Sequence, residues 1–301
     1  MNLAARSGDG ESSHVVASWW RSRYGAQMLV EIGICGGLLL IYRYIRTLKR
    51  TDLGAAFHHA REVVRLENWL GLPFEDNLQA FLLDHPLLIK GLNHYYIWFH
   101  FPMVIGLLVW LYFRHPDRYR PFRNLLAFST FTGLIIHLVF PLAPPRMMDG
   151  FVDTMAKYGP TIYPENALDG AANQIAAMPS LHFAWALIEA IAVVSVLSSR
   201  WRWTIVAHPV LMTLAIIATA NHWWIDAAAA AFLVILGIVL YRVLRAWAGD
   251  RSWSWTALRF RSATDLRRLE AFANESGNPD EATAADATVD PAEEVGEPVR
   301  C

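Results

Sequence analysis

Six apolar runs, each close to the length that crosses a lipid bilayer, constrain this chain more than any other feature. They cover residues 24–42, 95–113, 124–142, 180–197, 204–220 and 224–244. A transmembrane helix needs about 20 apolar residues, because the hydrocarbon core is about 30 Å thick. Stretches such as FLVILGIVLYRVL are apolar on every face, whereas a large soluble helical protein needs amphipathic stripes. The sequence therefore predicts an all-α polytopic membrane protein built on a bundle of six transmembrane helices.

The composition supports this class and narrows the possible functions. Charged residues make up 18% of the chain, below the roughly 25% of typical soluble domains. The net charge of -1 gives no electrostatic reason to expect nucleic-acid binding. The two cysteines, Cys35 and Cys301, are far apart, so neither a disulfide framework nor a cysteine metal site is expected. The first twenty residues are polar, and we expect no cleavable signal peptide.

Basic residues indicate how the chain is oriented. They gather in RHPDRYRPFR, SRWR and YRVLRAW, which fall on one side of the membrane if the chain crosses six times. Lys and Arg concentrate in cytoplasmic loops, so we place this side, with the N-terminal segment 1–23, in the cytoplasm. The loop 142–179 then lies outside. We expect a multi-pass protein of the plasma membrane with an extracytoplasmic site.

The first predicted span departs from this arrangement. Arg43, Arg46, Lys49 and Arg50 follow it on the side assigned to the exterior, and Glu31 lies inside it. A carboxylate within a bilayer is costly unless it is paired. We therefore expect this span to pack obliquely or late.

Two further regions differ from the membrane domain, which we place at residues 24–247. Within residues 51–90, the sequence AAFHHAREVVRLENWLGL predicts an amphipathic helix on the membrane surface. Residues 262–301 are rich in Asp, Glu, Ala, Thr and Pro and poor in large apolar residues, which is typical of a disordered acidic tail, here cytoplasmic.

Three polar segments on the predicted outer side contain the candidate site: PLAPPRM, MPSLHF and NHWWID. His222 and Asp226 are four residues apart and so share a helix face. The carboxylate can fix the imidazole tautomer and leave the other ring nitrogen free to attack. Ser180 and His182 stand at a helix start, where free N–H groups suit a phosphate. Arg146 can bind phosphate oxygens bidentately.

Each of these residues also has an ordinary explanation. An Arg beside a membrane segment is usually a headgroup anchor, and a Ser before a helix is usually a cap. Histidines near an interface are common, and this chain has five others that fit that description: His94, His100, His115, His137 and His208. The joint placement of the candidates on one predicted face is what favours a site.

The motifs Pro179-Ser180-Leu181-His182 and His222-x-x-x-Asp226 resemble those of the type 2 phosphatidic acid phosphatase superfamily. The likeness covers roughly residues 92–244 and implies a six-helix core with both motifs at one membrane face. It implies that His222 is the nucleophile, that Asp226 orients it, and that His182 protonates the leaving oxygen. Ser180 and Arg146 are implied to bind phosphate. No metal or other cofactor is expected.

Two cations of the usual superfamily motifs are absent from this sequence. Val139 stands where a Lys usually precedes the Arg, and Ala215 and Ile216 stand where Ser-Arg usually precedes the nucleophile. The pattern is more similar to the branch that contains the inositol phosphotransferases, such as fungal inositol phosphorylceramide synthase. Fewer cations suit a substrate with less charge on phosphorus, such as a diester.

The functional prediction is a membrane lipid phosphatase or phosphotransferase that forms a phospho-histidine. Its partner is a membrane lipid, and its acceptor is either water or a small polyol such as inositol; nothing points to an obligate protein partner. The alternative is a catalytically inactive lipid-binding or transport protein on the same fold. A metalloenzyme using His222 and Asp226 is the weakest possibility, because few other ligands stand near them in the sequence.

Overall fold

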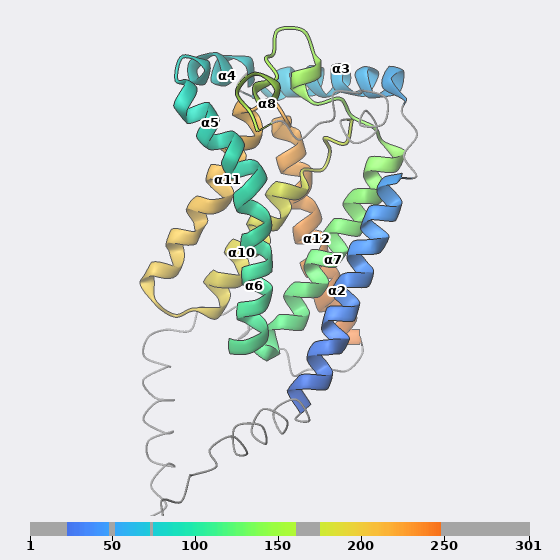
Figure 1. Cartoon of the computed structure of the whole chain (residues 1–301). Helices are drawn as coiled ribbons and strands as arrows, with labels where there is room; N and C mark the ends of the chain where they lie inside the picture. Colours follow the sequence, from blue (N-terminus) through green and yellow to red (C-terminus); the bar gives the residue numbers. More distant parts are fainter. Residues whose placement is uncertain (1–22, 48–51, 73–74, 161–174, 248–301) are drawn as a thin grey trace, which may run out of the picture.

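The structure, a computed structural model, describes residues 23–47, 52–72, 75–160 and 175–247 (Figure 1). Every regular element in these ranges is a helix, so the predicted all-α class is confirmed. The predicted N-terminal segment 1–23, apart from its last residue, and the predicted tail 262–301 lie outside the described residues.

The helices that make up most of the molecule lie side by side and form a bundle (Figure 1). They are α2 (Arg23–Thr47), α6 (His100–Arg114), α7 (Pro116–Val139), α10 (Leu181–Val196), α11 (Ala207–Ala218) and α12 (Trp224–Trp247). Helix α10 is the central one, because it packs against α6, α7, α11 and α12. Its Ala184, Ala186 and Ile188 are fully buried. The helix that begins at the P-S-x-H motif is therefore the core of the bundle.

Four helical stretches are long and apolar enough to cross a membrane: Pro86–Arg114, Pro116–Val139, Arg200–Ala218 and Trp224–Trp247. The first joins α5 (Pro86–His94), the π-helical turn η1 (Tyr95–Phe99) and α6. The third joins the 3-10 helix η3 (Arg200–Val206) to α11. The shorter α10 is apolar but has 16 residues, and α2 is not among the four. The described residues thus contain four candidate spans, and the count of six stays a prediction.

The outer faces of the bundle are apolar, as lipid contact requires. Large hydrophobic side chains are exposed along α2, α6, α7 and α12, including Leu40, Ile105, Val139 and Phe232. The interior contains small residues where helices approach closely. A Cβ on Gly237 of α12 would come within 2.7 Å of both Leu125 and Phe128 of α7. Small residues at such crossings let membrane helices pack by direct van der Waals contact.

Helix α2 lies along α7 on one side of the bundle (Figure 1). Its Glu31, which is 8% exposed, forms an ion pair with Arg123 of α7, and the Arg120 guanidinium lies 4.0 Å from the same carboxylate. The ion pair compensates the negative charge of Glu31, so the span does not carry an unpaired carboxylate.

One end of the bundle is covered by short helices, and the segments with the candidate residues lie there (Figure 1). They are α3 (Leu53–Leu70), α4 (Glu75–Leu83), η2 (Pro145–Met147) and α8 (Thr154–Tyr158). Helix α3 lies across this end and buries Ala56, Ala60, Val63 and Glu67 along one face. Its His59 ring contacts the carbonyl of Pro141 through Nδ1 at 2.7 Å.

The basic connections lie at the other end of the bundle. The turn between α6 and α7, helix η3 and the end of α12 are all there (Figure 1). These parts and the adjoining ends of α6 and α7 contain Arg114, Arg118, Arg120, Arg123, Arg200, Arg202, Arg242 and Arg245. The covered end and the basic end are therefore separated by the length of the bundle.

Candidate active site

The three polar segments predicted from the sequence meet at the covered end. Residues 142 and 175–177 run in parallel: the Leu142 N–H donates to Ile175 O at 2.8 Å, and Ala177 N–H donates to Leu142 O at 3.3 Å. The buried Trp223 indole donates to Ala143 O at 2.9 Å. These bonds fasten the PLAPPRM segment to the NHWWID segment and to the residues directly before MPSLHF.

His222 and Asp226 form a buried pair at the start of α12. Nδ1 of His222 lies 3.2 Å from Oδ2 of Asp226, and the same oxygen accepts the Trp223 N–H at 2.9 Å. Asp226 is fully buried and His222 is 5% exposed. The carboxylate therefore caps the first turn of α12 and orients the imidazole at once.

A main-chain carbonyl also contacts the His222 ring. Nδ1 lies 2.8 Å from the carbonyl oxygen of Ala177. Both groups that face Nδ1 are acceptors, so in the neutral imidazole Nδ1 must carry the proton. The lone pair is then on Nε2, the nitrogen that can attack an electrophile.

The backbone before His222 adopts an unusual conformation. Ala220 has φ +56°, in the left-handed region that costs a non-glycine residue about 1–2 kcal/mol. The carbonyl of Ala220 accepts the Arg146 N–H at 2.8 Å, and the N–H groups of Asn221 and His222 both donate to Ile216 O. This tight turn ends α11 and bonds the backbone before His222 to the PLAPPRM segment.

His182 lies in the first turn of α10, next to His222. The ring centroids of the two histidines are 6.3 Å apart. His182 also lies 4.1 Å from the ring of Tyr96, in the π-helical turn, and 5.0 Å from the ring of His100. The structure thus brings together the two histidines of the separate motifs.

Ser180 is the N-cap of α10. Its Oγ accepts the Phe183 N–H at 3.4 Å, and its own N–H donates to the backbone carbonyl of Asp226 at 3.1 Å. The side chain is fully buried. Ser180 therefore has the structural role considered from the sequence, and its backbone links the two motifs.

Arg146 is held beside the His222 segment. Nη1 donates to Asn221 Oδ1 at 2.8 Å, and Nε lies 3.7 Å from Asp153 Oδ2. The Arg146 side chain is 4% exposed. Asn221 was not singled out in the sequence, although its position directly before His222 was a usable signal.

The described part of the loop 142–179 is attached to α4 and α5. Gln79 bonds both the carbonyl and the N–H of Val152, at 3.0 and 2.8 Å. Asn93 donates to Thr154 O and Gly159 O, each at 2.9 Å. These amides hold the chain that follows Arg146 against the covered end; residues 161–174 lie outside the described ranges.

Two carboxyl groups cap α12 from outside its own sequence, and neither was predicted. Glu67 of α3 accepts the Ile225 N–H at 2.9 Å, and Glu75 of α4 accepts the Trp224 N–H at 3.3 Å. Burial, together with the neighbouring carboxyl of Glu75, raises the pKa of Glu67 to about 8. The surface helix α3 is thus connected directly to the helix that carries His222 and Asp226.

Among the described residues, the side chains close enough together to hold a metal ion do not include His222 and Asp226. The group of imidazole and carboxylate atoms close enough to hold an ion is His100, Glu189 and His208, which lies deeper in the bundle. The sequence treated His100 and His208 as ordinary histidines. Their contacts are taken up below.

The comparisons with known proteins agree with the geometry. A family model described as the PAP2 superfamily matches residues 61–240, which is more than half of the chain and includes all five candidate residues. The chain belongs to the PAP2 superfamily. No curated protein and no solved structure matches it. PAP2 superfamily membership supports an enzyme that acts on phosphate esters, and with the four apolar helices it supports an integral membrane protein.

Proposed function

We propose that this PAP2 superfamily member transfers or hydrolyses a phosphoryl group of a membrane lipid through a covalent intermediate on Nε2 of His222. The observation that carries the proposal is the placement of Nδ1 between Ala177 O and Asp226 Oδ2, at 2.8 and 3.2 Å. Two acceptors at one ring nitrogen fix the nucleophilic tautomer before substrate binds.

The proposed reaction has two steps. In the first, Nε2 of His222 bonds to phosphorus, the bond from phosphorus to the lipid oxygen breaks, and His182 gives that oxygen a proton. The positive charge that develops on the phospho-imidazole is stabilised by Asp226. In the second, water or an alcohol attacks phosphorus, the bond between phosphorus and nitrogen breaks, and His182 takes the proton of the attacking oxygen. Arg146 holds the phosphate oxygens, and the start of α10 at Ser180 adds its N-terminal field.

The substrate class follows from where the candidate residues lie. They are at an end of the bundle whose outer faces expose apolar side chains such as Val139 and Ile135. A lipid with its tails against these faces would bring its headgroup to the level of His222. The basic connections at the other end favour a cytoplasmic location for that end. We therefore propose a plasma-membrane protein with six crossings and an extracytoplasmic site.

We also propose that a diester headgroup is the better substrate and that a polyol such as inositol is a candidate acceptor. Val139 and Ile216 replace cations of the usual superfamily motifs, and Ile216 is fully buried among apolar residues. Arg146 is then the cation that the proposal assigns to phosphate. A diester carries one negative charge fewer than a monoester and needs less compensation.

The test uses full-length protein in detergent. It is incubated with radiolabelled phosphatidic acid, polyprenyl diphosphate or phosphatidylinositol, with and without free inositol. The proposal expects phosphate release or headgroup exchange with one of these, and a covalent phospho-enzyme that acid destroys and base preserves. Neither should occur in His222→Ala.

The matched control is His94→Ala. His94 is exposed on α5 and its ring bonds the carbonyl of Lys90 in the same helix. This variant should retain full activity. If wild type and His222→Ala bind the lipids equally well and neither turns any of them over, the chain is an inactive lipid-binding protein on this fold, and the proposal is wrong.

A further inference from the structure

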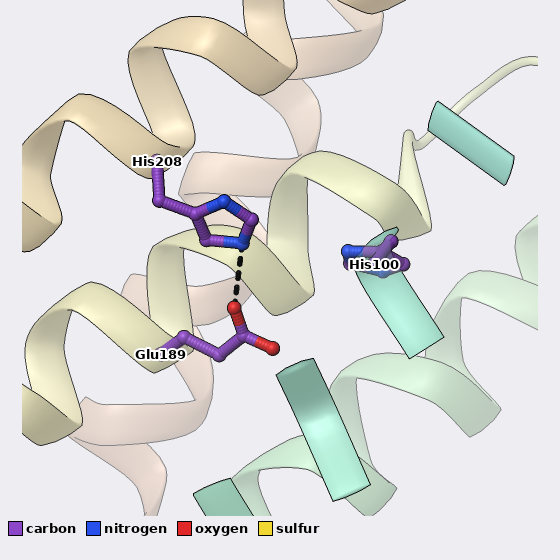
Figure 2. Close-up of side chains that lie close together, drawn as sticks. All are labelled: His100, Glu189 and His208. Carbon is purple, nitrogen blue, oxygen red and sulfur yellow. Dashed lines mark ion pairs between the residues drawn. The ribbon is translucent and has the colours of Figure 1, made fainter. Parts of the chain in front are cut away.

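A buried cluster of ionisable side chains lies below the candidate site, where three helices of the bundle meet. His100 begins α6, Glu189 lies in α10 and His208 lies in α11 (Figure 2). They are 0%, 1% and 7% exposed. One ligand atom from each lies within 4.8 Å of the other two. The proposed phosphoryl transfer does not use Glu189 or His208, so the cluster needs its own explanation.

Tyr95 contacts His208 at the ring nitrogen that faces away from Glu189. Its hydroxyl contacts Nδ1 of His208 and also donates to the His208 carbonyl oxygen at 3.3 Å. The hydroxyl can donate to that carbonyl and accept from Nδ1–H at the same time. In this arrangement the lone pair of His208 is on Nε2. Metal-binding histidines are oriented in this way, with the second ring N–H bonded to a neighbouring group.

The lone pair on Nε2 faces the carboxylate of Glu189. Nε2 lies 2.6 Å from Oε2, and the dashed line in Figure 2 marks this pair. Neither this nitrogen nor either Glu189 oxygen makes a directed hydrogen bond within the described residues. A lone pair and a carboxylate oxygen at this separation repel each other unless a positive species lies between or beside them.

His100 is a third buried side chain in the cluster that lacks a hydrogen-bond partner among the described residues. Both of its ring nitrogens are buried without a hydrogen-bond partner in the described part of the chain. Its ring stacks on Trp185, with centroids 5.3 Å apart. A polar group that is buried without a partner destabilises the folded state. A proton shared by Glu189 and His208 would satisfy those two residues and leave His100 unpaired, whereas a cation can bind all three.

We propose that His100, Glu189 and His208 form a buried binding site for a divalent transition-metal ion of the Zn²⁺ type. Two imidazole nitrogens and one carboxylate oxygen suit Zn²⁺, and they suit Mg²⁺ or Ca²⁺ poorly, because those ions prefer oxygen ligands. The ion ties α6, α10 and α11 together. The His100 ring lies 5.0 Å from that of His182. The same ion therefore holds in place a side chain that packs directly against the candidate site.

The test measures metal rather than activity, so it is independent of the proposed phosphoryl transfer. Full-length protein from zinc-supplemented cells, purified without a histidine tag, is analysed for zinc per chain by mass spectrometry. Wild type and the control His94→Ala should contain about one equivalent, while Glu189→Gln and His100→Ala should lose most of it. Zinc retained at the wild-type level by Glu189→Gln would place the ion elsewhere and overturn the proposal.

A second measurement decides the matter if those variants do not fold. Wild type is stripped with a chelator, and Zn²⁺ or Mg²⁺ is added. Zn²⁺ should raise the melting temperature and Mg²⁺ should not, because only the ion that binds the folded state stabilises it. X-ray absorption of the zinc form should show imidazole and carboxylate ligands at about 2.0–2.2 Å. If the stripped protein takes up no zinc and its melting temperature is unchanged, Glu189 and His208 share a proton and there is no metal site.

Discussion

Nδ1 of His222 lies closer to the carbonyl oxygen of Ala177 than to the carboxylate of Asp226, at 2.8 against 3.2 Å. The group that most closely fixes the imidazole tautomer is therefore part of the backbone. A side-chain substitution at Asp226 leaves this carbonyl in place. The expected roles of the two acceptors differ: Ala177 O sets the tautomer, and Asp226 supplies the negative charge.

Asp226→Asn should consequently lose activity without losing the phospho-enzyme. Loss of a triad carboxylate that alone sets the tautomer costs about 10⁴-fold in kcat. Here the Ala177 carbonyl keeps the proton on Nδ1, so we expect a smaller loss, about 10²–10³-fold. Rapid-quench measurement of the phospho-enzyme in Asp226→Asn and His222→Ala checks this. Equal inactivity of the two variants would show that the carbonyl does not suffice.

His182→Ala should be rescued by a better leaving group. If His182 protonates the departing lipid oxygen, its loss should slow phospho-enzyme formation by about 10²–10⁴-fold. A nitrophenyl phosphodiester needs no such proton, so most of the rate should return with it. The comparison is kcat for the lipid against kcat for the nitrophenyl ester, with His94→Ala as control. A loss of the same size on both substrates contradicts the general-acid role.

Glu67 should make the protein less stable as the pH rises. Its pKa is raised from 4.5 to about 8, first because it is buried. A carboxyl with a raised folded-state pKa contributes its full stability below its unfolded-state pKa and loses it as the pH rises through 8. The melting temperature in detergent should therefore fall between about pH 4.5 and pH 8 and level off above that, and Glu67→Gln should flatten this fall.

The matched control for that measurement is Glu62→Gln on the same helix. Glu62 is half exposed and bonds Arg65 one turn away. This variant should follow the wild-type profile. A fall of unchanged steepness in Glu67→Gln would assign the pH dependence to another group.

Gly237→Ala should destabilise the bundle, because the added Cβ would meet Leu125 and Phe128 at 2.7 Å. Overpacking of this kind costs about 1–3 kcal/mol. Gly106→Ala in α6 is the control, since no atom lies within 4 Å of a Cβ there. It should be neutral or stabilising by up to about 1 kcal/mol through helix propensity. Thermal unfolding of both variants in one detergent measures the difference, and equal melting temperatures would refute the close contact.

Local patterns were enough to predict the helical class, the membrane character and the family. The spacing of His222 and Asp226 placed them on one helix face, and the structure sets their side chains 3.2 Å apart. Their chemical roles, like those of His182, Ser180 and Arg146, stay predictions. What the sequence could show was periodicity and short motifs, because these depend on residues within one or two helical turns.

Contacts between distant segments could not be predicted in the same way. The acceptor at Ala177 is a carbonyl, which every residue has, so no residue type marks it. His100, Glu189 and His208 come from three helices, and nothing in their spacing brings them together. Glu67 lies within the predicted amphipathic helix, where a charged residue is ordinary, yet it is 5% exposed and caps α12. These relationships arise only once the bundle has formed.

The π-helical turn Tyr95–Phe99 has a consequence for the whole of the first candidate span. Hydrogen bonds from i to i+5 add a residue to one turn of an otherwise continuous helix. Shortening this segment by one residue would rotate α5 relative to α6 by about 100°. Tyr95 and Tyr96 would then leave His208 and His182, while the lower half would keep its lipid-facing side. The extra residue in the π-helical turn thus rotates α5 relative to α6. The side chains of α5 can therefore face the headgroup region while α6 keeps its own lipid-facing side.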